Sequence, residues 1–167
     1  MSQGQRRLLL LRHAKAVAPA PGAPDASDHA RGLSARGRLD AAVLGRLLRE
    51  RGLIPATALI STAVRTRETF DLLGLDPDRP RRIFSDALYL AAPETLLDLL
   101  REQGGAADSV MLVGHNPGMH ELALRLAADE APFEKGFPTC TLALFAIDHE
   151  WRDLAPACST LLDLLHA

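Results

Sequence analysis

"LLLLRHAKA", residues 8–16, places an arginine and a histidine directly after four consecutive leucines. A short, continuous apolar run of this kind is typical of a strand that is buried on both faces of a parallel sheet. Charged side chains do not belong at the end of a buried run unless a partner compensates for their loss of water. The stretch therefore predicts a first strand over residues 8–12 that presents Arg12 and His13 to a site.

Beyond this strand, short apolar runs alternate with segments of helical periodicity. Further strands are predicted at 57–61, 81–85, 109–114 and 139–147, and helices at 33–52, 65–74, 93–105 and 117–128. This alternation predicts an α/β fold, a single three-layer α/β/α domain over residues 1–167 with a mostly parallel sheet.

Three segments carry more detailed expectations. In the first predicted helix Ser34 is a plausible N-cap, Gly52 a plausible stop, and five apolar residues recur at helical spacing: Leu39, Val43, Leu44, Leu47 and Leu48. Residues 16–30 are rich in alanine and proline and predict an exposed loop. The tail from Trp151 fits either a strand or a helix.

Composition narrows the class of protein. The 167 residues suit one domain, and the 47% hydrophobic and 24% charged residues are typical of a soluble globular protein. A net charge of −2 argues against a nucleic-acid partner. Cys140 and Cys158 have neither metal-type spacing nor a disulfide framework. The early apolar run is too short for a signal peptide or a membrane span, so we expect a cytoplasmic protein without a membrane partner.

Distinctive polar groups follow three of the predicted strands. Arg12 and His13 follow the first, Arg65 stands four residues after Ser61 in "STAVRTRET", and His115 opens "HNPG" after the run 109–114. In an open α/β sheet, ligands bind outside the carboxyl ends of the strands. Each signal alone also fits a satisfied polar residue or a helix terminus, but their shared position predicts one site.

Two arginines and two histidines at one site suit an anionic ligand. A phosphoryl group carries close to two negative charges near neutral pH, and the guanidinium fork of arginine matches its oxygens. Flanking arginines disfavour protonation of a histidine, which leaves the neutral ring free to attack phosphorus. A metal site is the other sharp interpretation, but His13, His29, His115 and His120 lack compact ligand spacing, and the arginines would repel a cation. We therefore expect no metal and no cofactor.

These residues resemble the histidine phosphatase superfamily, whose fold is that of phosphoglycerate mutase. The Arg-His pair, the pattern S-x-x-x-R-x-x-x-T in "STAVRTRET" and the late "GHNPG" carry the resemblance, which covers nearly the whole chain. Within the superfamily, the chain is most similar to the small phosphohistidine phosphatases of the SixA type. "RGLSARG" (31–37) resembles an arginine-containing stretch of that group, and Ala14 stands where most of the superfamily has glycine.

The resemblance implies a role for each site residue. His13 is the nucleophile that becomes phosphorylated, and the rest of the catalytic phosphate pocket is Arg12, Arg65 and His115. It also implies substrate contacts from Arg31, Lys15 and Asn116.

Larger members of the superfamily carry a general-acid carboxylate after the third strand, and this chain departs from that pattern. Its segment reads "SDALYLAAPETL" (85–96), with Tyr89 or Leu90 at the expected acid position. Asp86 and Glu94 are nearby, although Glu94 just after Pro93 fits a first-turn helix residue. A missing acid disfavours an alkoxide leaving group but not imidazole, which leaves phosphohistidine as a neutral molecule.

The sequence thus predicts a metal-independent phosphatase acting on phosphohistidine, with inorganic phosphate as product. The chain has no room for long substrate lids, so the expected partner is a phosphorylated protein such as a histidine-containing phosphotransfer domain. Two alternatives stay open at this point: a phosphomonoesterase for small sugar or nucleotide phosphates, and a non-catalytic phosphate-binding module.

Overall fold

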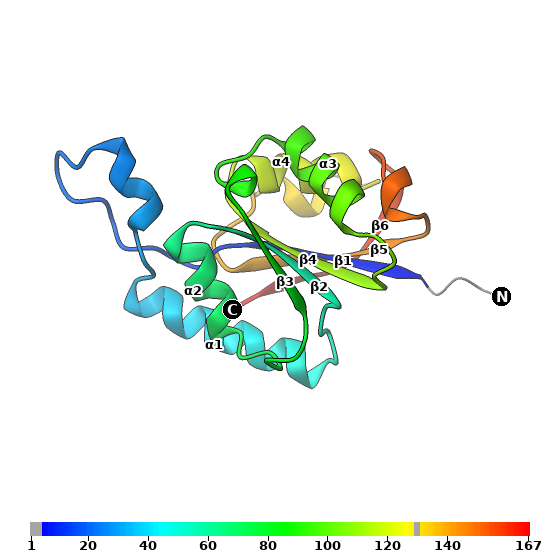
Figure 1. Cartoon of the computed structure of the whole chain (residues 1–167), viewed down its shortest axis with the longest axis horizontal. Helices are drawn as coiled ribbons and strands as arrows, with labels where there is room; N and C mark the ends of the chain where they lie inside the picture. The colour runs from blue at the N-terminus through cyan, green and yellow to red at the C-terminus, as the bar shows by residue number, and fades with distance from the viewer. Residues whose placement is uncertain (1–4, 129–130) are drawn as a thin grey trace.

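The computed structural model describes residues 5–128 and 131–167, and its centre is a six-stranded sheet (Figure 1). The strands lie in the order β3-β2-β4-β1-β5-β6. Their bounds are β1 (Arg6–Arg12), β2 (Thr57–Ser61), β3 (Arg81–Ser85), β4 (Ser109–Gly114), β5 (Thr141–Ile147) and β6 (Ser159–His166). Neighbours from β3 to β1 pair in parallel, whereas β5 is antiparallel to β1 and β6. The prediction of a mostly parallel sheet is confirmed.

Helices cover both faces of this sheet, which confirms the three-layer arrangement. The α-helices are α1 (Ala35–Glu50), α2 (Val64–Leu72), α3 (Pro93–Gln103) and α4 (Gly118–Leu126). Short 3-10 helices are η1 (Asp25–Ala30), η2 (Asp86–Leu88), η3 (Ala131–Phe133) and η4 (Trp151–Asp153). Figure 1 shows α1 and α2 below the sheet and α3 and α4 above it.

The leucine run of β1 lies at the centre of both hydrophobic cores. Leu8 and Leu10 belong to the core formed with α3 and α4, and Leu9 and Leu11 to the core formed with α1 and α2. All four side chains are buried, because alternate residues of a strand point to opposite faces and both faces are covered. This explains why the run is uniformly apolar rather than alternating.

The first predicted helix has the expected N-cap, but only part of its apolar spacing lies on the buried face. The Ser34 Oγ accepts a hydrogen bond from the Gly37 N–H, as an N-cap does. However, Leu39 and Val43 are 66% and 43% exposed whereas Leu44 and Leu48 are fully buried, so the apolar spacing identified only part of the contact face. The reason is a close helix contact: a Cβ at Gly45 would lie 2.0 Å from the Leu73 carbonyl oxygen. Small residues on α1 permit this approach, and these two larger ones face outward.

The structure corrects the expectation for residues 16–30 and decides between the two alternatives for the tail from Trp151. Residues 16–30 are not loop throughout, because residues 25–30 form η1. The tail becomes η4 followed by β6 at the edge of the sheet, and the buried Trp151 donates from Nε1 to the Ala107 carbonyl oxygen over 2.7 Å. No helix in the described ranges is both long and apolar enough to cross a membrane. The single-domain assignment over 1–167 stays a prediction, and residues 1–4 and 129–130 lie outside the described part.

Candidate active site

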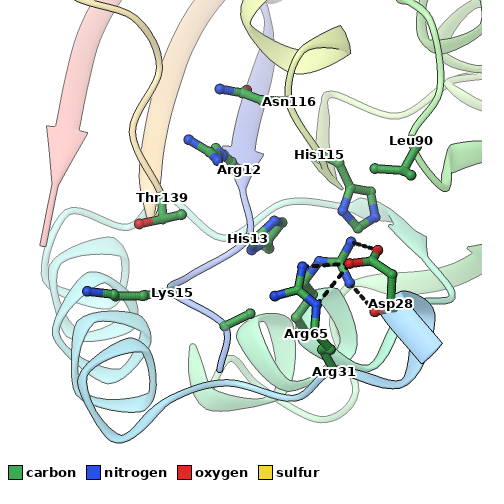
Figure 2. A pocket seen from close by; sticks show the side chains of 11 residues that line it. Arg12, His13, Lys15, Asp28, Arg31, Arg65, Leu90, His115, Asn116 and Thr139 are labelled. Atoms are coloured by element: carbon green, nitrogen blue, oxygen red, sulfur yellow. Dashed lines mark hydrogen bonds and ion pairs between the residues drawn. The ribbon is translucent and has the colours of Figure 1, made fainter. Parts of the chain in front are cut away.

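The carboxyl ends of β1, β2 and β4 meet at one edge of the sheet. Arg12 pairs with Gly114 across β1 and β4, and the His13 N–H donates to the Gly114 carbonyl oxygen over 3.1 Å. A pocket of about 430 Å³ opens at this edge (Figure 2). It brings together all seven residues predicted for the site, and its lining is Arg12, His13, Lys15, Ala16, Asp28, Arg31, Arg65, Leu90, His115, Asn116 and Thr139.

His13 is oriented by its own backbone. Its Nδ1 lies 2.7 Å from the Ala14 carbonyl oxygen. A carbonyl can only accept, so Nδ1 carries the ring proton and Nε2 keeps the lone pair. The Ala14 N–H in turn donates to the Thr69 Oγ1 over 2.9 Å, which anchors this peptide to α2. The arrangement leaves Nε2 of His13 as a nucleophilic nitrogen.

The environment also keeps this ring neutral. The pKa of His13 is lowered from 6.5 to about 4, mainly by burial and also by the positive charges of Arg65, Arg12 and Arg31, which together outweigh the hydrogen bond to Ala14. The sequence attributed the neutral ring to the arginines, whereas burial is the larger cause. An unprotonated imidazole at physiological pH is the form that can attack phosphorus.

His115 stands opposite His13 across the pocket. The two ring centroids are 5.2 Å apart, and the His115 Nε2 lies 2.8 Å from the Ser61 Oγ at the end of β2. Burial is the main cause that lowers the pKa of His115 to about 3, and His13 and Arg65 add to it. Its Nδ1 is buried and has no hydrogen-bond partner in the described structure.

The two predicted phosphate-binding arginines donate hydrogen bonds to other described residues from their terminal nitrogens but not from Nε. Arg12 donates from one terminal nitrogen to the Phe137 carbonyl oxygen over 2.9 Å. Arg65 is 2% exposed and donates to the main-chain and side-chain oxygens of Asp28 at 2.7 and 2.8 Å. The Nε atoms of both arginines are buried without a partner among the described residues.

Asp28 is a site residue that the sequence interpretation missed. Its Oδ1 accepts from the Nε and a terminal nitrogen of Arg31 at 2.9 and 2.6 Å, and its Oδ2 accepts from Arg65 and from the Tyr89 hydroxyl at 2.6 Å. Burial opposes ionisation, but the hydrogen bonds from Tyr89, Arg31 and Arg65 outweigh it and hold the pKa of Asp28 well below its usual range. The sequence did carry one signal for this residue: Asp28 and Arg31 are three positions apart, the spacing of an ion pair on a helical turn. Asp28 was not recognised because residues 16–30 were predicted to be a loop.

The residues predicted from the resemblance as substrate contacts all line the pocket, but they differ in how strongly hydrogen bonds to the protein hold their side chains. Arg31 is engaged by Asp28 and by the Val17 carbonyl oxygen at 2.7 Å. Lys15 is exposed at the rim, and none of the ion pairs between described residues includes it. The Asn116 amide donates to the Phe137 carbonyl oxygen over 2.9 Å, while its Oδ1 is buried and has no partner in the described ranges.

No carboxylate of the segment after β3 lines this pocket. Leu90 does line it, with a φ of 49°, and Tyr89 is bonded to Asp28 instead. Asp86 is exposed and accepts from the Thr62 hydroxyl. Glu94 forms an ion pair with Arg125 at 2.6 Å on α4, in keeping with a surface role. Among the residues described, no group of three or more His, Cys, Asp or Glu side chains is placed to hold a metal ion.

Known proteins share this sequence and this architecture. A protein of Agrobacterium tumefaciens, provisionally named phosphohistidine phosphatase SixA, is 33% identical with a TM-score of 0.82, over 97% of this chain and 98% of its own. This chain belongs to the histidine phosphatase superfamily. A superfamily structure from Nakamurella multipartitia with the same provisional name is 26% identical, with a TM-score of 0.80 and coverage of 99% and 98%. An uncharacterized protein of Mycobacterium tuberculosis is 34% identical over 90% of this chain and 96% of its own length. No family model matches the chain.

The superfamily members that this chain resembles are phosphatases, which supports a hydrolase of the phosphatase type. The expected phosphoglycerate mutase-like fold of the SixA group is confirmed.

Proposed function

We propose that this phosphatase hydrolyses phosphohistidine through a phosphorylated intermediate on His13. The observation that carries the proposal is a set of buried polar side-chain atoms that have no hydrogen-bond partner in the described part of the chain. The buried polar side-chain atoms that lack a partner among the described residues all belong to the pocket: Arg12 Nε, Arg65 Nε, His115 Nδ1 and Asn116 Oδ1. A buried donor without a partner is costly. A phosphoryl group supplies acceptors for the two arginine Nε–H groups and for His115 Nδ1–H, the tautomer in which Nε2 accepts from the Ser61 hydroxyl.

In the first half of the reaction, the His13 Nε2 attacks phosphorus and the bond to the leaving group breaks. The Nδ1 proton stays on the ring, held by the Ala14 carbonyl oxygen. Arg12 and Arg65 bind the phosphoryl oxygens, and His115 donates from Nδ1 to the charge that develops in the transition state. The pocket carries four basic side chains, Arg12, Lys15, Arg31 and Arg65, against the single carboxylate of Asp28 in its lining.

In the second half, water attacks the phosphorus of phosphorylated His13. The P–N bond breaks and its electron pair returns to Nε2, so the ring departs neutral with its Nδ1 proton in place. Inorganic phosphate is the product. The arginines supply the positive charge that a metal ion supplies in other phosphoryl transfers, so the reaction needs no divalent cation.

The leaving group of the first half favours P–N over P–O substrates. Asp86 and Glu94 lie outside the pocket lining, and the one carboxylate in that lining, Asp28, is held ionised by its hydrogen bonds. No carboxylic acid in the lining is therefore set to protonate a departing alkoxide. A phosphomonoesterase of small sugar or nucleotide phosphates is the alternative that a hidden proton donor would support.

The proposed partner is a phosphorylated protein, such as a histidine-containing phosphotransfer domain. The described residues contain no inserted subdomain over the pocket, and the rim carries the exposed Lys15 and Leu90. A phosphohistidine on a protein surface could reach an uncovered pocket of this kind, whereas a small metabolite gains from enclosure. The cytoplasmic location also stays a prediction.

The test is to incubate the protein with a phosphorylated phosphotransfer domain whose phosphohistidine is radiolabelled, and to trap the phosphoenzyme by rapid quenching into alkali. We expect label on His13, and its loss in His13→Ala. His120→Ala is the matched control, because this histidine bonds the Phe133 carbonyl oxygen and does not line the pocket. Arg65→Ala should lower turnover about 100-fold or more. Full turnover by His13→Ala would refute the covalent mechanism.

A further inference from the structure

The carboxylate of Asp28 has no assigned part in the reaction described so far. It lines the pocket from η1, a segment separate from the strand ends that carry His13 and His115. Its side chain is 30% exposed, so a ligand can reach it. Figure 2 shows the carboxylate beside Arg31 and Arg65, on the His115 side of the pocket. Since Asp28 is ionised, it cannot donate a proton, but it can accept a hydrogen bond.

A substrate phosphohistidine brings an N–H that needs an acceptor. When one ring nitrogen carries the phosphoryl group, the other must be protonated for the ring to leave as neutral imidazole. The enzyme's own phosphorylated His13 meets the same requirement through the Ala14 carbonyl oxygen, 2.7 Å from Nδ1. The chemistry is symmetrical, because a P–N bond to imidazole breaks in both halves. The N–H of the substrate ring therefore needs an acceptor that serves it as the Ala14 carbonyl oxygen serves His13.

We propose that the Asp28 carboxylate accepts a hydrogen bond from the second ring nitrogen of the substrate phosphohistidine and keeps that nitrogen protonated while the P–N bond breaks. This inference rests on the proposed function. The His13 Nε2–P bond forms, the substrate P–N bond breaks, its electron pair stays on the substrate nitrogen, and neutral imidazole departs. The proton on the second nitrogen does not move.

Asp28 can accept a hydrogen bond from a substrate once a bound phosphoryl group draws an arginine donor away from its carboxylate. Each of its oxygens already accepts two hydrogen bonds, from Arg31 twice and from Arg65 and Tyr89. A bound phosphoryl group competes for the arginine donors, and each donor that turns to phosphate frees a lone pair of Asp28. The charged and titratable groups around this carboxylate and across the pocket are Arg31, Arg65, Tyr89, His115, His13, Arg12 and Lys15.

Asn116 offers a second amide or carboxylate acceptor in the pocket lining. Its Oδ1 is buried and has no partner in the described ranges, whereas the Asp28 side chain is partly open to solvent. Asp28 is also charged, and a hydrogen bond to a carboxylate stabilises a protonated imidazole ring more than one to a neutral amide. These two differences favour Asp28.

The test compares two substrates that differ in the leaving group. One is a phosphohistidine peptide, and the other is p-nitrophenyl phosphate, whose leaving phenolate has no ring N–H. Asp28→Asn disturbs Arg31 and Arg65 and so should lower kcat/KM on both substrates. The loss on the peptide should exceed the loss on the aryl phosphate by about 10- to 100-fold, the effect of one hydrogen bond to a charged group. The matched control is Asp25→Asn, an exposed carboxylate of the same 3-10 helix outside this pocket.

The pH dependence of kcat on the peptide gives a readout that a purely structural role would not change. A carboxylate partner raises the pKa of the substrate ring, so the wild type should keep its turnover to higher pH than Asp28→Asn. Asp28→Glu retains the negative charge and should restore part of the preference for phosphohistidine. Equal losses on both substrates, or no loss on the peptide, would overturn the inference.

Two other outcomes separate the inference from the function beneath it. A selective loss in Asn116→Ala, with none in Asp28→Asn, would assign the acceptor role to Asn116 and refute the role of Asp28. A wild type that cleaves p-nitrophenyl phosphate but not the phosphohistidine peptide would overturn the proposed function, and this inference with it.

Discussion

Lowering the pH from 8 to 5 should leave the rings of His13 and His115 neutral, although an ordinary histidine becomes protonated over this range. Burial is the largest cause for both rings and lowers their pKa values to about 4 and about 3. For His13, the positive charges of Arg65, Arg12 and Arg31 act in the same direction. The proposed nucleophile, His13, should therefore keep its lone pair in mildly acidic solution.

The size of the effect follows from these values. At pH 5, a ring with the ordinary pKa of about 6.5 is roughly 3% neutral, and a ring with a pKa near 4 is roughly 90% neutral. The nucleophile should be available about 30-fold more often than an unperturbed histidine. The same shift affects stability, because the unfolded chain binds more protons than the native state between pH 6.5 and 4. The contribution of these rings to stability is complete above pH 6.5 and is lost as the pH falls toward 4.

The assay is an NMR titration of the histidine Cε1–H signals from pH 8 to pH 5. His13→Gln and His115→Gln assign the two signals, and the other four histidines of the chain serve as internal references. Neither assigned signal should move appreciably above pH 5. Added inorganic phosphate should shift both midpoints upward, because an anion between the rings favours their charged form. A midpoint at or above pH 6.5 for His13 in the phosphate-free protein would refute the reasoning.

Four further outcomes are expected. His13→Ala should abolish turnover with little change in Tm, since its side chain lies at the end of a strand facing the pocket; a differential scanning measurement beside the activity assay checks this. Gly45→Ala should destabilise the fold by about 1–3 kcal/mol in urea unfolding, because the added Cβ would lie 2.0 Å from the Leu73 carbonyl oxygen. Glu94→Gln and Asp86→Asn should change phosphohistidine turnover only modestly. Excess chelator should not change this turnover, and strict dependence on added metal would contradict the mechanism.

The sequence by itself predicted five of the six strands and the seven proposed site residues that share the pocket. A short run of four leucines is typical of a strand covered on both faces, and the structure confirms that strand as β1. The carboxyl ends of parallel strands lie at one edge, so Arg12, His13 and His115 had to come together once their strands were recognised. Arg65 follows the same logic from the end of β2. These inferences needed only periodicity and the geometry of parallel pairing.

Only the tertiary structure decided how the pocket is completed. Asp28 reaches Arg65 across 37 positions of sequence from a segment rich in alanine and proline, and no local pattern encodes such a contact. The outward position of Leu39 depends on the close approach of α1 to another part of the chain, where Gly45 meets Leu73. Hydrophobic periodicity reports that a helix has an apolar face, but the neighbouring elements determine which side chains that face buries and which carboxylate meets an arginine.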